Sequence, residues 1–260
     1  MKISIITVCY NSDATIRNTL ESVLSQTYSD IDYIVVDGKS TDDTVSIIKE
    51  YEPKFNGKIR WISEPDNGIY DAMNKGIEMA NGDIVGLLNS DDYYNSNNVL
   101  TLVVEEMSKN NIDSCYGNLL YLKNKKPYRF WKAGKKKSFK WGWMPPHPSF
   151  FVKKIIYEKY GLFRLDCGVN ADYELMLRLL ELKNISTKWL DYTIVCMNVG
   201  GISNKNIHSR IDAIKDNKIA WTINKVKPSI VTLFIKRLRK IPQYFMAKFY
   251  KNKIIRSYLL

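Results

Sequence analysis

The 260-residue sequence lacks the features that mark a covalently cross-linked, zinc-bound or membrane-spanning protein. Its four cysteines lie far apart and form no CxxC pair, so neither a disulfide framework nor a zinc site is indicated. No apolar run approaches the roughly 20 residues that a transmembrane helix needs. The chain opens on an apolar strand pattern, from which we expect no signal peptide and, with the unpaired cysteines, a cytoplasmic protein.

Acidic side chains are absent after Asp216, where 11 basic residues follow. Residues 1–113 contain 9 Lys/Arg and 19 Asp/Glu, a net charge of −10, whereas residues 114–260 contain 30 and 8, a net charge of +22. The first part is suited to holding cations and the second to meeting anions, such as nucleic acid, anionic lipid or a diphosphate group. No helix-turn-helix, zinc-finger or RNP-like pattern supports nucleic acid, and no G-x-G-x-x-G supports a dinucleotide dehydrogenase.

Strand and helix patterns alternate over the first 110 residues. Apolar runs predict strands, and spacings of three and four predict helices between them. The expected strands are 3–8, 31–36, 58–62 and 84–88, and the expected helices are 14–25, 41–48 and 70–80. This alternation predicts an α/β domain whose mostly parallel central sheet is flanked by helices. Ligands bind beyond the carboxyl ends of the strands in such sheets.

Polar side chains follow all four predicted strands, at Tyr10, Asp37, 64–67 and 91–92. Adjacent carboxylates repel each other unless a cation lies beside them, and Mg²⁺ or Mn²⁺ is the natural partner where a diphosphate shares it. Asp37 can accept a hydrogen bond from a base or ribose. The alternatives are an Asx-turn at Asp37 and a pair of solvated turn acids at 91–92.

Eight segments share their order and spacing with a known family. They are TVCYN (7–11), ATI (14–16), LESVLSQ (20–26), VVDG (35–38), STD (40–42), EPDNGIYDAMNKG (64–76), ANGD (80–83) and LNSDD (88–92). The sequence thereby resembles bacterial family 2 glycosyltransferases with the GT-A fold, of the type that assembles O-antigen and exopolysaccharide. The resemblance is dense over 3–95, continues thinly through 147–148, 171–174 and 200–203, and is weak beyond about residue 205.

The resemblance implies roles for ten residues. Those that would bind the nucleotide-sugar are Thr7, Cys9, Tyr10, Asp37, Asp66, Lys75 and Asp91. Asp92 would ligate the metal, Asp172 would be the general base, and His147 would contact a phosphate or the acceptor sugar. Two departures are Lys39, where relatives often have a small residue, and Ala171, where many have a second acid.

The chemistry of these residue types is consistent with sugar transfer. A divalent metal neutralises charge on a departing nucleoside diphosphate, and a carboxylate takes the proton from the acceptor hydroxyl. One base and direct displacement imply inversion, so an α-linked donor gives a β-linkage. The resemblance points to a UDP-activated hexose or N-acetylhexosamine as donor and to an undecaprenyl-diphosphate-linked saccharide as acceptor.

The second part of the chain predicts less regular structure. Residues 123–140 contain nine Lys/Arg and no acid, which indicates a surface loop or hairpin. The spacing over 172–182 predicts a helix, on which Glu174 and Arg178 would form a surface pair. We place a catalytic domain at 1–205, with a nucleotide-sugar part at 1–113 and an acceptor part at 114–205, and a basic helical tail at 206–260.

The tail combines apolar and cationic side chains at helical spacing. Its expected apolar face comprises Val231, Phe234, Ile235, Leu238, Ile241, Phe245 and Phe249. Eight basic residues lie between 236 and 256, and each is worth about 1 kcal/mol on an anionic surface. This pattern favours a helix at the inner face of the cytoplasmic membrane, interrupted at Pro242, over a helix packed on the catalytic domain. Two other functions remain open, namely a nucleic-acid-binding protein and an inactive membrane adaptor.

Overall fold

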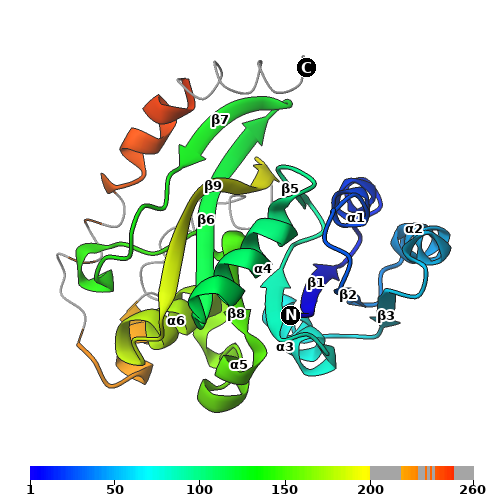
Figure 1. The fold of residues 1–260 in the computed structure, drawn as a ribbon. Coiled ribbons are helices and arrows are strands. Elements are labelled where there is room, and N and C mark those ends of the chain that lie inside the picture. The colour runs from blue at the N-terminus through cyan, green and yellow to red at the C-terminus, as the bar shows by residue number, and fades with distance from the viewer. Residues whose placement is uncertain (200–217, 228–231, 233–234, 236–237, 249–260) are drawn as a thin grey trace.

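The structure is a computed structural model that describes residues 1–199, 218–227, 232, 235 and 238–248 (Figure 1). Its strands are β1 (Ile3–Cys9), β2 (Ile31–Asp37), β3 (Ile59–Ser63), β4 (Ile84–Leu87), β5 (Asp92–Tyr94), β6 (Ser114–Lys123), β7 (Lys126–Trp131), β8 (Phe150–Lys153) and β9 (Thr187–Asn198). Its helices are α1 (Ile16–Leu24), α2 (Thr44–Tyr51), α3 (Ile69–Met79), α4 (Val99–Asn110), α5 (Lys154–Tyr160) and α6 (Ala171–Met176), the last continued by a π-helical segment, Leu177–Leu182. The predicted α/β class is confirmed.

A single curled sheet has the strand order β3-β2-β1-β4-β8-β6-β9-β5, and β7 pairs with β6 as a hairpin. The first four strands are parallel, as the alternating strands and helices predict. In the second part β8 runs antiparallel to both of its neighbours, β9 runs parallel to β6, and β5 runs antiparallel to β9. The carboxyl ends of β1–β4 therefore share one edge, and the loops after them lie together.

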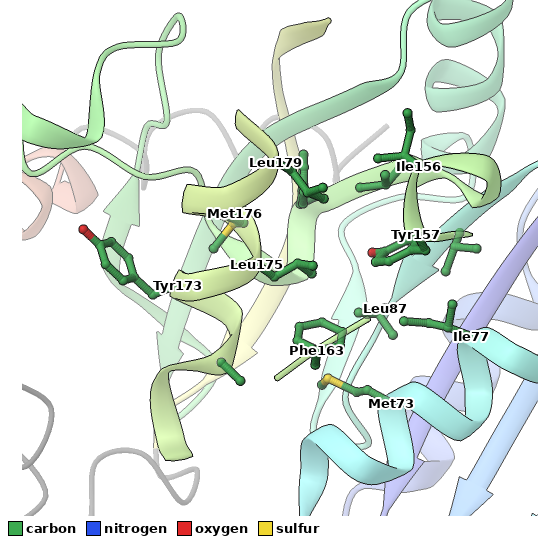
Figure 2. Packing of buried hydrophobic residues seen from close by; sticks show 14 of the residues in the cluster. Met73, Ile77, Leu87, Ile156, Tyr157, Phe163, Tyr173, Leu175, Met176 and Leu179 are labelled. Atoms are coloured by element: carbon green, nitrogen blue, oxygen red, sulfur yellow. The ribbon is translucent and has the colours of Figure 1, made fainter. Parts of the chain in front are cut away.

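Two apolar clusters cover the two faces of the sheet. Side chains of α3, α5 and α6 pack on one face, and those of α1, α2 and α4 pack on the other. Figure 2 shows Phe163 between Met73 of α3 and Leu175 of α6. Gly76 lets α3 approach β1 closely, because a Cβ there would lie 2.3 Å from Cγ2 of Ile6. These contacts hold α3 against one face of the sheet, close to β1.

The expected surface pair of Glu174 and Arg178 is wrong, because both side chains are buried. The Arg178 guanidinium donates to both oxygens of Glu174, at 2.9 and 3.0 Å, and to the carbonyl groups of residues 160–162. Asn224 also donates to Glu174, at 2.9 Å. A spacing of four residues places two side chains on one face of a helix but does not say whether that face meets solvent.

The described residues of the predicted tail pack against the catalytic part. Trp221, in the helical residues 218–223, is buried and donates to the Tyr173 hydroxyl at 2.9 Å. The helical residues 241–248 lie beside the β6–β7 hairpin (Figure 1), where Ala247 joins a cluster with Leu120 and Phe130. Residues 206–217 and three members of the expected apolar face (231, 234 and 249) lie outside the described residues. Within the described part, no helix has the length and apolarity to cross a membrane.

Candidate functional site

The ends of β1, β2 and β3 converge at Gly38. A Cβ at this glycine would lie 2.5 Å from Oδ2 of Asp66 and 3.5 Å from the ring of Tyr10. Tyr10 is exposed, and Asp66 Oδ1 accepts a hydrogen bond from the Gly68 amide at 2.8 Å. The structure therefore brings together an exposed ring, a carboxylate and bare backbone, as the sequence predicts for this edge.

Asp37 is wholly buried at the end of β2, and both of its oxygens are occupied. Oδ1 accepts from the Ser40 hydroxyl at 2.5 Å and from the Cys9 thiol at 3.6 Å, while Oδ2 accepts from the Ser40 amide at 3.0 Å and the Ser63 hydroxyl at 2.6 Å. Burial and the neighbouring Asp37 raise the pKa of the Cys9 thiol, which stays protonated. The carboxylate shapes the turn after β2, as the Asx-turn interpretation expects.

Thr7 and Lys75, two further residues expected at the nucleotide-sugar site, both bond to neighbouring protein groups. Thr7 is wholly buried within β1, where its hydroxyl accepts from the Tyr33 hydroxyl at 3.0 Å. Lys75 Nζ lies 2.7 Å from Glu64 Oε1 and donates to the Pro65 carbonyl at 2.9 Å. The hydrogen bond to Glu64 raises the pKa of Lys75. Lys75 thus fastens the loop that carries Asp66 to α3.

Asp92 is a wholly buried carboxylate at the start of β5. Its Oδ2 accepts from Asn89 Nδ2 at 3.2 Å, but its Oδ1 has no partner among the described residues. Burial and then the charge of Asp91 raise the pKa of Asp92 well above its usual range, and burial also raises that of Asp91. An orphaned buried carboxylate oxygen beside a second acid suits a divalent cation.

The described residues contain no group of three metal-ligating side chains. Mg²⁺ in phosphate-handling sites usually takes only one or two carboxylates and completes its shell with substrate phosphates and water. Asp92 alone is therefore consistent with a cation that arrives with a diphosphate. The Ser12 and Ser90 hydroxyls, 2.8 Å apart, join the loop before Asp91 to the loop after β1.

Asp172 lies in the first turn of α6, partly exposed, and its Oδ1 accepts from the Tyr173 amide at 2.7 Å. The His147 ring packs edge-on against the Phe163 ring, with the two ring centroids 5.5 Å apart. Burial lowers the pKa of His147, and the charge of Asp172 opposes this shift only in part. The structure thus gathers Asp172 and a neutral imidazole on the same side of the sheet as α3.

Tyr70 and Asn74 are functional candidates that the sequence analysis did not assign. The Tyr70 hydroxyl donates to the Val169 carbonyl at 3.0 Å, and Asn74 holds the Phe163 backbone through two hydrogen bonds of 2.9 Å. Burial and then Asp172 raise the pKa of Tyr70 well above its usual range. The available signal was the spacing of four, which places both residues on one face of α3.

Comparison with known proteins identifies the family. The sequence profile described as Glycosyl transferase family 2 matches residues 4–166. The chain belongs to glycosyl transferase family 2. The match ends before Asp172, so the proposed base lies outside the profile.

Curated relatives of this family 2 glycosyltransferase agree with the profile. An uncharacterized glycosyltransferase of Mycobacterium tuberculosis is 35% identical over 187 residues, which cover 68% of each chain. A glycosyltransferase of PGL/p-HBAD biosynthesis from the same species is 25% identical over 214 residues, covering 77% of this chain and 78% of that protein.

Solved structures confirm the GT-A type of fold. Staphylococcus aureus TarS in complex with UDP-GlcNAc is 18% identical, with a TM-score of 0.66, and the match covers 89% of this chain and 68% of that one. The Pyrobaculum calidifontis mannosyltransferase PcManGT, in complex with GDP-Man and Mn²⁺, is 15% identical, with a TM-score of 0.65 and coverage of 95% and 73%.

Proposed function

We propose that this glycosyltransferase moves a hexose or N-acetylhexosamine from a UDP-sugar to a saccharide on undecaprenyl diphosphate, with a β-linkage, in bacterial surface polysaccharide (O-antigen) synthesis. The observation that carries the proposal is the orphaned, buried Oδ1 of Asp92 at the edge where the donor-binding strands end. The UDP-GlcNAc and GDP-Man complexes of TarS and PcManGT support a nucleotide-sugar donor.

Each side chain then has a task in a single displacement. Tyr10, Asp66 and the backbone at Gly38 bind the nucleotide, and Lys75 orders the loop that carries Asp66. Asp172 takes the proton of the acceptor hydroxyl as that oxygen bonds to the anomeric carbon and the bond to UDP breaks. A Mn²⁺ or Mg²⁺ ion held by Asp92 would stabilise the charge on the departing diphosphate.

A panel of UDP- and GDP-sugars, with and without Mn²⁺, tests the donor assignment by thermal unfolding. At a concentration of about 100 times Kd, a bound donor stabilises the fold by about 2.7 kcal/mol. We expect stabilisation by UDP-sugars only when Mn²⁺ is present, and none in Asp92→Asn. Stabilisation by GDP-sugars instead would replace the donor class, and no shift with any donor would contradict an active enzyme.

We also propose that residues 238–248, which contain the C-terminal helix (241–248), bind the anionic inner face of the cytoplasmic membrane. Leu238, Ile241 and Phe245 are 52%, 54% and 62% exposed, although residues 241–248 pack on the β6–β7 hairpin through Gln243 and Ala247. Three basic residues, Arg239, Lys240 and Lys248, lie in the same segment as these exposed apolar side chains, which we call the outward face. An apolar strip with cationic neighbours is typical of a helix at a lipid interface.

Vesicle sedimentation tests the membrane proposal. Leu238→Glu and Phe245→Glu should each weaken binding to phosphatidylglycerol vesicles, because each puts a charged carboxylate into the interface. Ile155→Glu, at a residue that is 58% exposed on α5, is the matched control. Equal binding by all three variants and the wild type would show that the outward face serves another partner.

A further inference from the structure

Arg129 of β7, in the part of the chain that we assign to the acceptor (114–205), is surrounded by three aromatic rings and one side-chain amide. Its guanidinium carbon lies 4.3 Å from the centroid of the Tyr121 ring, 5.4 Å from that of Trp131 and 5.9 Å from that of Tyr244. Its Nε donates to Oε1 of Gln243 at 2.6 Å. Three rings and one amide therefore fix the direction of a partly buried cation.

Arg129 differs from the other arginines of residues 1–199, each of which faces a carboxylate. Their ion pairs are Arg17–Glu50, Arg60–Asp32, Arg164–Asp166 and Arg178–Glu174. Among the residues that the structure describes, Arg129 has no acidic partner, and its only hydrogen bond uses Nε. The two terminal nitrogens remain for a planar, two-pronged interaction with an anion such as phosphate.

The strand register places Arg129 on the same face of the sheet as Asp92. Asp92 pairs with Met197, Met197 with Tyr121, and Tyr121 with Arg129, so the four residues form one row across β5, β9, β6 and β7. Directly paired residues project to one face, and three strand spacings separate the ends of the row by about 14 Å.

Tyr121 supports the same placement. Burial raises the pKa of Tyr121, the charge of Arg129 opposes this shift, and Asp92 and Asp172 add to it. The charges of Arg129, Asp92 and Asp172 therefore all influence the Tyr121 phenol, which the register places beside Arg129.

We propose that Arg129 binds a phosphate group of the acceptor, namely the diphosphate of a lipid-linked saccharide. This assignment rests on the proposed transfer to such an acceptor. Asp92 and its cation would take the donor diphosphate at one end of the row, and Arg129 would take the acceptor diphosphate at the other end. The diphosphate of a lipid-linked acceptor would enter from the side of the membrane, and the segment that carries the outward face, residues 238–248, contacts Arg129 through Gln243.

The C-terminal helix completes this anion site as well as flanking it. Gln243 and Tyr244 contribute the hydrogen bond and the third ring around Arg129. The Tyr244 ring also packs edge-on against the Tyr128 ring of the hairpin, with the two ring centroids 5.4 Å apart. The helix therefore holds the guanidinium in place, and the eight other basic residues of 123–140 attract anions toward it.

Farnesyl diphosphate serves as the probe, with farnesol as its uncharged counterpart, and binding is followed by tryptophan fluorescence in EDTA. Arg129→Gln should weaken farnesyl diphosphate binding at least tenfold, the change that a charge-assisted hydrogen bond typically supplies. Arg129→Lys should fall between wild type and Arg129→Gln, because it keeps the charge without the fork. Lys126→Gln, which removes one charge from the same hairpin, should bind nearly as the wild type does. Equal affinities in Arg129→Gln and wild type would overturn the proposal.

Two further measurements distinguish the possible sources of phosphate. Arg129→Gln should keep its binding of phosphatidylglycerol vesicles and its Mn²⁺-dependent stabilisation by UDP. A comparable loss on vesicles would assign Arg129 to lipid headgroups, and a loss with UDP would assign it to the donor; either result overturns the acceptor assignment. If the wild type binds farnesyl diphosphate but no nucleotide-sugar, the proposed transfer fails while the anion site stands. The melting temperature of each variant separates lost binding from lost folding.

Discussion

Two regions of the molecule differ in whether their buried or partly buried charged groups have partners: the nucleotide side, at the ends of β1–β3, and the reaction side, at β5–β7. At the ends of β1–β3, Asp37 accepts four hydrogen bonds from three residues and Lys75 has an ion pair. On the β5–β7 side, Oδ1 of Asp92 and the terminal nitrogens of Arg129 have no partner among the described residues. Unpaired buried charge costs stability and is retained where a ligand completes it. In the first region the charges of Asp37 and Lys75 are therefore paired without substrate, whereas in the second region Asp92 and Arg129 leave positions that a ligand can fill.

Replacing Asp92 by Asn gives the largest expected effect. Transfer should fall by about three orders of magnitude or more, because stabilisation of the leaving diphosphate by a metal is worth several kcal/mol. Without metal the same variant should unfold at a temperature equal to or above that of the wild type, since the amide removes a buried, unpaired charge. Activity assays and calorimetry in EDTA measure the two effects.

Asp30→Asn, at an exposed acid, is the control for the Asp92 variant and should change neither property. A metal-free Asp92→Asn protein that is clearly less stable than the wild type would make Asp92 a structural carboxylate. The contrast with Asp37 would then disappear.

Asp172→Asn comes next, with an expected loss of about 10²- to 10⁴-fold in kcat. The amide cannot accept the acceptor proton, but donor binding does not depend on it. The affinity for UDP-sugar in the presence of Mn²⁺, measured by calorimetric titration, should therefore equal that of the wild type. A near-normal turnover, or an equal loss of donor affinity, would exclude Asp172 as the base.

Asp37→Asn should show the opposite stability effect to Asp92→Asn. The amide nitrogen cannot accept from Ser40 or Ser63, so we expect a loss of about 2 kcal/mol in the free energy of unfolding, within the range for hydrogen bonds to a charged group. Chemical denaturation in EDTA measures it. If both variants changed stability in the same direction, the proposed difference between the two regions would be wrong.

The sequence was sufficient for the parts of the fold that depend on local pattern. The strands β1 and β2 are wholly buried, as continuous apolar runs in a parallel sheet predict. An Asx-type turn from Asp37 to Ser40 was the alternative interpretation of that short spacing, and contact of Asp37 with a base or ribose stays a prediction.

Long-range partners were beyond the reach of the sequence. The Tyr70 hydroxyl meets a carbonyl 99 residues away, and Arg129 meets Gln243 at a separation of 114 residues. The expected apolar face of the tail was read from spacing alone, and spacing does not show that Gln243 and Ala247 pack on the hairpin while Phe245 points outward. Tertiary packing decides such choices, as it does for Glu174 and Arg178.

Tyr70→Phe tests whether α3 positions the reaction side. Loss of the hydrogen bond to the Val169 carbonyl should lower kcat by about tenfold or less, in line with about 1 kcal/mol for one neutral hydrogen bond, and leave donor affinity unchanged. Tyr28→Phe is the matched control, because the Tyr28 hydroxyl donates to the Met1 carbonyl far from the site. An equal loss of melting temperature in the two variants, with unchanged kcat in both, would leave Tyr70 with a purely structural role.

The smallest expected effect concerns the pH dependence of stability at His147. Burial lowers the pKa of the folded imidazole below its usual value near 6.5, so between these two values the unfolded chain binds more protons. The stability that this residue contributes is therefore present above about pH 6.5 and is lost as the pH falls through the folded pKa. His147→Gln should flatten the decline in the free energy of unfolding between about pH 7.5 and 5, measured by urea denaturation. An undiminished decline in His147→Gln would place the titrating group elsewhere, and the acids of the reaction side would be the next to test.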